Sequence, residues 1–386
     1  MKTVKVALLG ACGWMGKCHT LAYRNANLLF PKLTGIPELA WLIDDSEPRL
    51  TELQSVCRAA NTSRSWKDSI EDPDVDLVDI CLPDYLHFPV ARAALQAGKN
   101  VYCEKPFTAT AEQAAELTEL AEKHNLVTRV GHNFPKNPAH DVARDIIQNG
   151  EIGEVVLFRS SMHVDVLSDA RAPYMWRCDD RIAPTGAVGD IASHVFSFIH
   201  RLIGPVDRVV ADVAITTQRR PYSEGFGYGM PITKPSSTDT HEVTTADLVT
   251  LLCSFKGGGR GVIDVSRVAT GRRFLQNYEL YGTKGSLEYR FEEVNRLRFF
   301  STEDRPGRQG FRAIDVGPEN ANYAAFLPVA GFALGYNEFK AIEVCEVIEA
   351  VASSKPMWPT FRDAYEIMKI VDACFNSSAQ RAWVSV

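Results

Sequence analysis

The sequence lacks the features that mark several classes of protein. None of its nine cysteines forms a C-x-x-C pair, and no spacing typical of a zinc site is present. No apolar run reaches the length of a transmembrane helix, and the amino-terminal residues lead into a predicted strand instead of forming a signal peptide. The sequence also has no internal repeat and no low-complexity tract. We therefore expect no metal, and a cytoplasmic protein whose scattered cysteines are buried free thiols.

Clusters of basic residues are missing as well. Arg and Lys are spread along the chain, the formal net charge is -6 and the isoelectric point is about 5.9. This balance argues against nucleic acid or an anionic membrane surface as the main partner. With 45% hydrophobic and 23% charged residues the composition is that of an ordinary globular protein.

The first third of the chain alternates short apolar strands with helices. A length of 386 residues favours two domains. Strands are predicted at 4–9, 39–43, 76–81, 100–103 and 127–130, and helices at 17–25, 46–60, 88–97 and 111–124. This alternation predicts a doubly wound, parallel α/β sheet, a Rossmann dinucleotide-binding domain over residues 1–131.

Beyond residue 132 strands follow one another. They are predicted at 154–163, 206–215, 246–255, 261–268, 277–281 and 286–291, with helices at 139–149, 191–203, 335–353 and 361–377. The last strand alternates strictly between apolar and polar residues, which predicts an α+β domain over 132–386 on a large, mostly antiparallel, open-faced sheet. Two stretches, 218–240 and 302–334, are irregular; the first is either a lid or oligomer arm, or a surface loop.

A glycine-rich turn follows the first predicted strand and opens the first helix. Its spacing is G-x-x-G-x-x-G rather than G-x-G-x-x-G, but it places backbone N–H groups at a helix start, where a pyrophosphate can bind. Gly13 allows close approach of phosphate, and Gly16 allows close packing of the helix. The candidate cofactor-binding residues here are Gly10, Cys12, Gly13, Trp14, Met15 and Gly16.

Asp44 ends the second predicted strand, where an acidic side chain hydrogen-bonds the adenosine ribose and disfavours a 2′-phosphate. It follows Gly10 by 34 residues instead of about 20, and we attribute the surplus to a loop over 29–38. NAD is therefore favoured, although Arg49 keeps NADP open. The alternative is that Asp44 is a simple polar strand end.

Polar residues follow the other parallel strands, where doubly wound sheets bind ligands. Lys105 stands at such an end, before Pro106, which fixes the turn. Partly desolvated beside a nicotinamide, this lysine could donate a proton; otherwise it is a solvated surface residue. The other candidates for cofactor contacts at strand ends are Leu82, Pro83, His87, Glu104 and Asn133.

A second glycine-rich stretch, 186–194, leads into the predicted helix 191–203 and contains Asp190 and His194. Four residues apart, they lie on one helix face, so the carboxylate can orient the imidazole and stabilise its protonated form. The pair is suited to moving a proton. The alternative is two ordinary helix residues.

Several of these motifs together resemble the Gfo/Idh/MocA family, which includes glucose–fructose oxidoreductase and inositol dehydrogenase. The matching stretches are 13–19 (GWMGKCH), 98–106 (GKNVYCEKP), Trp176-Arg177, 186–194 and the tail from Phe361 to Val384. The segment 171–177 and the long carboxy-terminal half are most similar to dehydrogenases of pyranosides and of anhydrosugars such as levoglucosan.

The resemblance implies an NAD(P)-dependent oxidoreductase acting on a sugar, anhydrosugar, glycoside or inositol. The family's catalytic lysine, aspartate and histidine fall on Lys105, Asp190 and His194, and the acidic residue before the lysine falls on Glu104. The first glycine of the nucleotide loop departs from the family's usual spacing, which suggests a feature of a subgroup and not a loss of nucleotide binding.

We expect hydride transfer between a secondary hydroxyl and the nicotinamide, with His194 as general base oriented by Asp190 and Lys105 on the reacting oxygen. Two alternatives are a carbonyl reductase on a keto-sugar and a non-catalytic sugar and NAD sensor. A homodimer or homotetramer through the open sheet face is expected. Further candidates for substrate or nicotinamide contacts are Asn133, Arg159, His163, Asp165, Trp176 and Arg177.

Overall fold

The computed structural model describes residues 1–222 and 239–386, which form two compact units. The first unit comprises Met1–Asn133 and Tyr336–Tyr365, and the second comprises Phe134–Gly335 and Glu366–Val386. The prediction assigned all of 132–386 to one domain, but the segment Tyr336–Tyr365 packs with the first unit. Each unit is described by itself.

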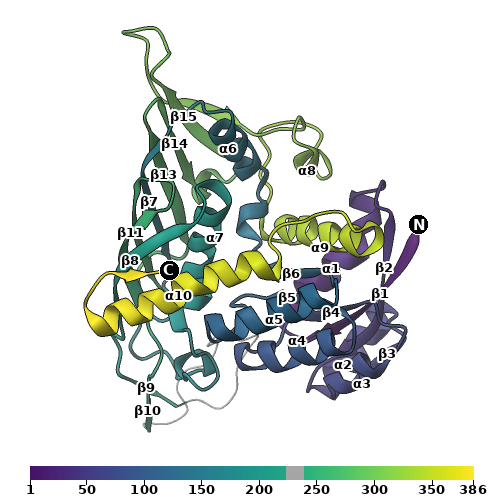
Figure 1. Ribbon diagram of the computed structural model, residues 1–386. Coiled ribbons are helices and arrows are strands. Elements are labelled where there is room, and N and C mark those ends of the chain that lie inside the picture. Colours follow the sequence, from purple (N-terminus) through teal and green to yellow (C-terminus); the bar gives the residue numbers. More distant parts are fainter. Residues whose placement is uncertain (223–238) are drawn as a thin grey trace. The chain divides into compact units, whose positions relative to one another are not determined.

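The first unit is built on a six-stranded parallel sheet with the order β3-β2-β1-β4-β5-β6 (Figure 1). The central strand β1 is hydrophobic, and Val6, Ala7 and Leu8 are fully buried because helices cover both faces of the sheet. The predicted doubly wound parallel sheet is confirmed. The strands are β1 (Lys2–Leu9), β2 (Gly35–Ile43), β3 (Asn61–Ser63), β4 (Leu77–Ile80), β5 (Asn100–Glu104) and β6 (Thr128–Gly131).

Helices α1 (Trp14–Leu29) and α9 (Tyr336–Ser353) pack against each other and against strands of this sheet. Both α1 and β2 are longer than predicted, so the expected loop over 29–38 is reduced to residues 30–34. Much of the extra length between Gly10 and Asp44 lies in regular structure, and Pro37 is accepted within β2. The other helices are α2 (Glu47–Cys57), α3 (Trp66–Glu71), α4 (His87–Gln96) and α5 (Ala111–Lys123); the sequence did not predict β3 and α3.

The second unit is built on a nine-stranded sheet with the order β16-β15-β14-β13-β7-β12-β11-β8-β17. Its neighbours are antiparallel except β7 and β12, which are parallel, so the expected mostly antiparallel sheet is confirmed. The strands are β7 (Val155–His163), β8 (Val206–Ala214), β11 (Leu248–Phe255), β12 (Arg260–Ser266), β13 (Leu275–Gly282), β14 (Gly285–Arg290), β15 (Arg296–Ser301), β16 (Arg312–Asp315) and β17 (Val384–Ser385).

Helices α6 (Pro138–Gln148) and α7 (Ser193–Leu202) pack on one face of this sheet. On β7, Phe158, Ser160 and Met162 are buried on the helix side, while Arg159 on the other face is exposed. This alternation is the period-two pattern of a half-covered sheet. Helix α10 (Phe361–Gln380) begins in the first unit and continues in the second.

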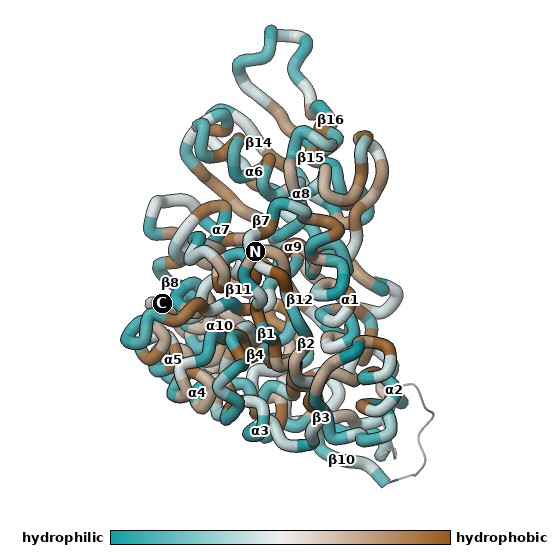
Figure 2. Tube along the Cα trace, turned by 90° about the vertical axis from the view of Figure 1, so that its right-hand side faces the viewer, coloured by the Kyte–Doolittle hydropathy of each residue, from teal (hydrophilic) through white to brown (hydrophobic). Residues whose placement is uncertain are grey.

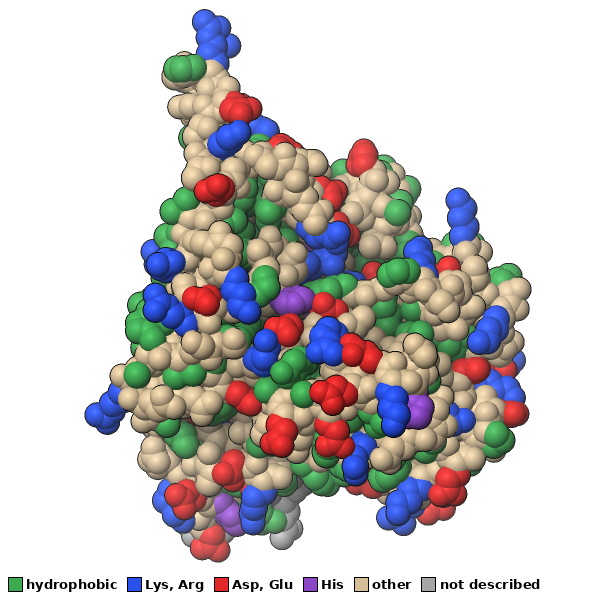
Figure 3. Space-filling view, in the orientation of Figure 1, with side chains coloured by type: hydrophobic (Ala, Val, Ile, Leu, Met, Phe, Trp, Pro, Cys, Tyr) green, Lys and Arg blue, Asp and Glu red, His purple; other side chains and the backbone are tan. Residues whose placement is uncertain are grey.

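The two stretches predicted to be irregular contain regular elements. In the first, β9 (Arg219–Pro221) pairs with β10 (Thr240–Glu242), and residues 223–238, on which the lid or arm prediction mainly rests, lie outside the described residues. The second contains β16 and α8 (Ala321–Ala324), so it was only partly irregular. The loop joining β15 to β16 is hydrophilic (Figure 2) and has basic side chains at its tip (Figure 3).

Within the part of the chain that the structure describes, no helix is both long enough and apolar enough to cross a membrane.

Candidate active site

The glycine-rich turn between β1 and α1 is packed closely against its neighbours. Gly10 has φ +78°, and a Cβ on it would lie 2.3 Å from the Cys81 carbonyl oxygen. A Cβ on Gly16 would lie 2.3 Å from the Gly10 oxygen, whereas one on Gly13 would meet that oxygen only at 3.4 Å. The turn therefore needs glycine at its ends, and Gly13 leaves the start of a 16-residue helix without a side chain, as suits close approach of a phosphate.

Asp44 follows β2 and holds this turn in place. Its Oδ2 accepts a hydrogen bond from the Cys12 amide at 2.9 Å, and its Oδ1 accepts one from the Ser46 amide at 3.2 Å. Burial raises the pKa of Asp44 above its ordinary value, while these amides act in the opposite direction. An acidic strand end beside a glycine-rich helix start fits a dinucleotide whose ribose hydroxyls bind the carboxylate.

Two predicted cofactor residues of this turn contact α9. The Trp14 ring, which is 47% exposed, stacks on Tyr336 with 5.1 Å between ring centroids. The Tyr336 hydroxyl lies 3.2 Å from the Met15 sulfur. The carboxy-terminal part of the chain thus supports the nucleotide loop, a contact that no local pattern predicts.

Lys105 follows β5, is partly exposed and is joined to Pro106 by a cis peptide bond. The His87 ring lies between two backbone carbonyls: Nδ1 is 2.7 Å from the Pro106 oxygen, and Nε2 is 2.8 Å from the Leu82 oxygen. Burial lowers the pKa of His87, so the ring is neutral and donates to one carbonyl at a time. The structure thus brings Leu82, His87 and the Lys105 turn together.

Beneath Lys105, the Glu104 carboxylate is buried among charged side chains. Its Oε1 lies 2.6 Å from the Lys340 ammonium and 3.0 Å from His19 Nε2. Burial by itself would raise the pKa of Glu104, but Lys340 and His19 hold it well below its ordinary value. The sequence had singled out Glu104 for the cofactor; its visible partners are protein cations.

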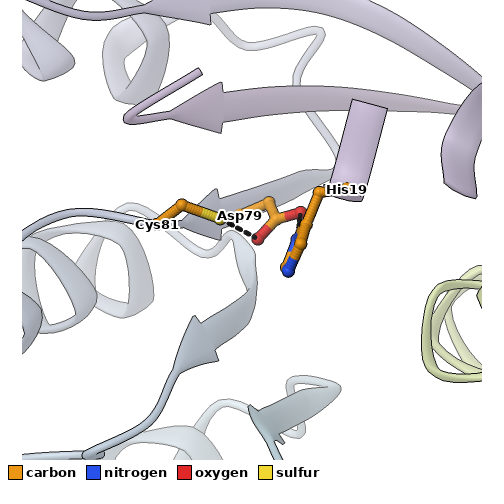
Figure 4. Close-up of side chains that lie close together, drawn as sticks. All are labelled: His19, Asp79 and Cys81. Carbon is orange, nitrogen blue, oxygen red and sulfur yellow. Dashed lines mark hydrogen bonds and ion pairs between the residues drawn. The ribbon is translucent and has the colours of Figure 1, made fainter. Parts of the chain in front are cut away.

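His19, Asp79 and Cys81 lie close together (Figure 4), and His19 also contacts Glu104. The His19 Nδ1 is 2.7 Å from the Asp79 carboxylate, which also accepts a hydrogen bond from the Tyr23 hydroxyl at 2.8 Å. Burial would lower the pKa of His19, but Asp79 and Glu104 raise it, so both nitrogens donate. Burial keeps the pKa of the Cys81 thiol high. Because both imidazole nitrogens carry protons toward carboxylates, this donor set suits an ion-pair cluster rather than a metal.

In the second unit, the Asp190 helix starts earlier than predicted. A π-helical turn, Val188–Ala192, precedes α7, so Asp190 lies in the wider turn and His194 in the first turn of α7. A Cβ on Gly189 would lie 2.0 Å from the Thr185 hydroxyl, so glycine permits this turn. Such turns frequently occur at functional sites.

Asp190 is held together with two other predicted residues. Its carboxylate lies 3.5 Å from Arg177 Nε, and the Arg177 guanidinium lies 4.0 Å from the centroid of the Trp176 ring. The Arg177 carbonyl accepts hydrogen bonds from Arg267 and Thr245, and Arg267 in turn pairs with the buried Asp247. A buried ion pair therefore supports the segment that carries Trp176 and Arg177.

His194 is buried against aromatic side chains. Its ring meets that of Phe134 edge-on at 4.8 Å, and Phe134 also contacts Phe274 at 5.4 Å. Phe198, one turn after His194, contacts Tyr278 at 5.8 Å. Helix α7 therefore runs along β13, with His194 toward the Phe274 end.

This arrangement places Gln276, between Phe274 and Tyr278 on the helix side of β13, near His194. The residue is 1% exposed, and among the described residues its amide nitrogen and oxygen have no hydrogen-bond partner. The sequence analysis missed Gln276, Phe134, His19 and Lys340. For Gln276, the available signal in the sequence was a polar residue at an inward-facing strand position. The sequence around Lys340 contains no comparable signal.

Two predicted substrate residues, Arg159 and His163, lie on the sheet face opposite to the one that helix α7 covers. Arg159 is on the open face of the sheet, opposite Glu279, and His163 pairs there with Asp264. Asp165 follows β7 and lies 3.5 Å from Arg273. Asn133, by contrast, is buried at the end of the first unit's amino-terminal segment.

Comparison with known proteins identifies the class. Residues 4–132 match the oxidoreductase family with an NAD-binding Rossmann fold, and residues 140–288 match the GFO/IDH/MocA C-terminal domain. The chain belongs to this family of oxidoreductases. The recognition made from sequence motifs, the NAD-binding fold and the assignment as an oxidoreductase are therefore confirmed.

Within the family the similarity to levoglucosan dehydrogenases extends over the whole chain. The curated enzyme from Pseudarthrobacter phenanthrenivorans is 32% identical over 387 residues, covering 100% of this chain and 99% of the relative. A solved levoglucosan dehydrogenase in complex with NADH and levoglucosan is 31% identical, with TM-score 0.92 and complete coverage of both chains. An NAD-binding oxidoreductase from Klebsiella pneumoniae is 32% identical, with TM-score 0.91 and coverage of 100% and 99%.

Proposed function

We propose that the protein is an NAD-dependent dehydrogenase that oxidises a secondary hydroxyl of a pyranose, with anhydrosugars such as levoglucosan as the first substrates to test. The full-length similarity to an enzyme solved with NADH and levoglucosan carries the substrate class. The presence of Lys105, Asp190 and His194 at the positions that match the family's catalytic set supports an enzyme over a sensor.

Bound NAD supplies the hydride acceptor. We assign to His194 the removal of the hydroxyl proton, since a neutral imidazole acts as a base near neutral pH. Asp190 stabilises the imidazolium that results, and the Lys105 ammonium stabilises charge on the reacting oxygen. The sugar loses one hydride and one proton and becomes a ketone.

Four residues are proposed to recognise the sugar. Trp176 offers an aromatic face for a pyranose ring, and Arg177 offers donors for hydroxyl groups. Asn133 and Gln276 each contribute a buried amide. An amide that is buried without a protein partner discriminates strongly for a hydroxyl, because a deoxy-sugar would leave it unpaired.

The test is reduction of NAD measured at the absorbance of NADH, with a panel of levoglucosan, glucose, methyl glucosides, L-sorbose and inositols. The proposal expects at least one sugar to be oxidised, and Lys105→Ala and His194→Ala each to lose roughly 10²–10⁴-fold in kcat. Lys123→Ala, on an exposed helix end, is the matched control and should behave as the parent. Near-normal turnover in both active-site variants would contradict the assignment.

We also propose a cytoplasmic homodimer or homotetramer that associates through the open face of the second unit's sheet. Val210, Leu252 and Val262 form a lateral apolar row on that face, and Leu252 is 46% exposed. Exposed apolar rows on sheets favour burial against a partner. Leu252→Glu should lower the mass measured by light scattering after gel filtration; an unchanged oligomer would place the interface elsewhere.

A further inference from the structure

A buried cluster of charges lies behind the Lys105 turn. Each member is at most 4% exposed, and they come from α1, β4, β5, β6 and α9 of the first unit. Burying ions is costly unless each is paired, so a cluster of this size needs a reason beyond packing. Its members are His19, Asp79, Glu104, Arg129, Lys340 and Glu343.

We propose that Lys340 is a positioning residue for Lys105. Its ammonium holds the Glu104 carboxylate and so fixes the backbone from which the Lys105 side chain extends. The inference rests on the proposed catalytic role of Lys105 and adds to it a residue more than two hundred positions away in the sequence.

The contacts of Lys340 restrict the Glu104 carboxylate to one position. The Lys340 ammonium is fully buried and donates to Glu104 at 2.6 Å, to Glu343 at 2.5 Å and to the Tyr102 hydroxyl at 3.1 Å. Three donors with three acceptors satisfy the ammonium completely. If the Lys340 side chain moved, the buried carboxylates of Glu104 and Glu343 would lose the cation that they share, which is energetically costly.

The Glu104 carboxylate is in turn linked to Lys105. Its second oxygen, Oε2, lies 3.3 Å from the Lys105 amide nitrogen. Gly131 at the end of β6 makes room for the carboxylate, because a Cβ there would lie 2.3 Å from Oε1. On the other side of Lys105, His87 binds the Pro106 carbonyl. The lysine backbone is therefore held on both sides, and a catalytic group held in this way keeps its geometry.

Several titratable groups face Glu104. His19 comes from α1, Cys81 from the end of β4, Cys103 from β5, His132 from the segment after β6 and Lys340 from α9. Burial lowers the pKa of His132 to about 3, so His132 is neutral, and burial keeps both thiols protonated. His19 and Lys340 are therefore the cations on which an ionised Glu104 depends.

The first test is Lys340→Met, which keeps the length of the side chain and removes its charge. We expect kcat with levoglucosan, or with the best sugar of the panel, to fall on the order of 10²-fold, the effect of misplacing a catalytic group by about 1 Å. The KM for the sugar and the Kd for NADH, measured by fluorescence, should change less than about threefold, since no binding contact is removed. The pH profile of kcat should gain a new acid limb, because Glu104 now takes up a proton in the assay range.

A second variant keeps the test decisive if Lys340→Met by itself does not fold. Lys340→Met combined with Glu343→Gln removes one charge of each sign and keeps the net charge of the cluster. It should show the same loss of kcat and the same acid limb. Lys99→Met is the matched control, because Lys99 is also buried in the first unit but donates to the Asp72 and Val75 carbonyls. It should change stability and leave kcat and its pH profile unchanged.

The outcomes separate this inference from the proposed function. If Lys105→Ala is inactive but a folded Lys340 variant keeps kcat within about twofold with an unchanged pH profile, the positioning role is wrong and the function stands. If Lys105→Ala keeps its turnover, the catalytic role of Lys105 fails first. A loss confined to NADH affinity in the Lys340 variants would also overturn the inference, since it would make Lys340 a support of the nucleotide loop.

Discussion

The two proposed catalytic elements are held by different forces. Lys105 lies above a network of buried ion pairs, in which Glu104 contacts Lys340 and His19 at 2.6 and 3.0 Å. His194 lies against the rings around Phe134, and the preceding turn is shaped by Gly189 against Thr185. The first element is fixed by electrostatics in a buried environment, and the second by packing and backbone shape.

This difference suits the chemistry proposed for each residue. Lys105 has to keep its charge and its direction toward a reacting oxygen, and paired ions around its backbone resist displacement. His194 has to gain and lose a proton, and the edge-on contact with Phe134 helps to orient its ring. The following changes test the contrast, from the largest expected effect to the smallest.

The largest effect is expected from adding one methyl group beside each element. Gly189→Ala would place a Cβ 2.0 Å from the Thr185 hydroxyl, and Gly131→Ala would place one 2.3 Å from a Glu104 oxygen that Lys340 and His19 prevent from moving away. Each should lower kcat/KM roughly 10²-fold through misplaced catalytic groups. Steady-state kinetics measure the effect. Gly257→Ala, where a Cβ would meet nothing within 4 Å, should be neutral; if it costs as much, local geometry is not the cause.

Removing the Asp44 carboxylate should weaken binding of the cofactor without changing the catalytic residues. Asp44→Ala loses both the link to the Cys12 amide and the proposed partner of the ribose. We expect the Kd of NADH to rise at least about tenfold, the value of a hydrogen bond to a charged group, and the Kd of NADPH to rise less. Fluorescence titration gives both constants. Asp74→Ala on the surface removes the same charge and should change neither; equal weakening of the two cofactors would remove the ribose role of Asp44.

Replacing Phe134 by a smaller side chain should affect turnover of the sugar and leave binding of NADH unchanged. Phe134→Leu removes the ring that meets His194 edge-on at 4.8 Å. Since such ring pairs contribute about 0.5–1.5 kcal/mol, kcat/KM for the sugar should fall roughly two- to tenfold, with NADH affinity unchanged. Phe311→Leu, at an exposed position, is the control. A change in NADH affinity instead would show that Phe134 supports cofactor binding rather than His194.

The last comparison concerns acid stability, where no effect on cofactor or sugar binding is needed to see the role of Glu104. Burial opposes ionisation of Glu104, but Lys340 and His19 hold its pKa below the ordinary value of 4.5. The ionised group therefore stabilises the folded state above pH 4.5, and this contribution is lost as the pH falls toward the folded pKa. Urea unfolding of the parent and of Glu104→Gln should differ at neutral pH and converge in acid. A gap that persists unchanged in strong acid would mean that the charge of Glu104 is not what stabilises the fold.

Much of the fold was predictable because it depends on local patterns. The alternation of short apolar strands with helices defines the parallel sheet, since each strand buried on both faces has to be hydrophobic. The glycine spacing at 10–16 and the acidic residue after β2 likewise follow from backbone geometry. Errors fell where context overrides local preference: Pro37 lies inside β2, and the helix before His194 starts with a π-helical turn.

The sequence by itself thus determined the family, the nucleotide loop and the residues that match the catalytic set, because these are short motifs with a direct physical reason. Only the tertiary structure decided what supports them. Lys340 reaches Glu104 from a position 236 residues further along the chain, and Phe134, 60 positions before His194, packs its ring edge-on against the imidazole. Such contacts are set by the packing of distant segments and the pairing of buried charges, so no local pattern contains them.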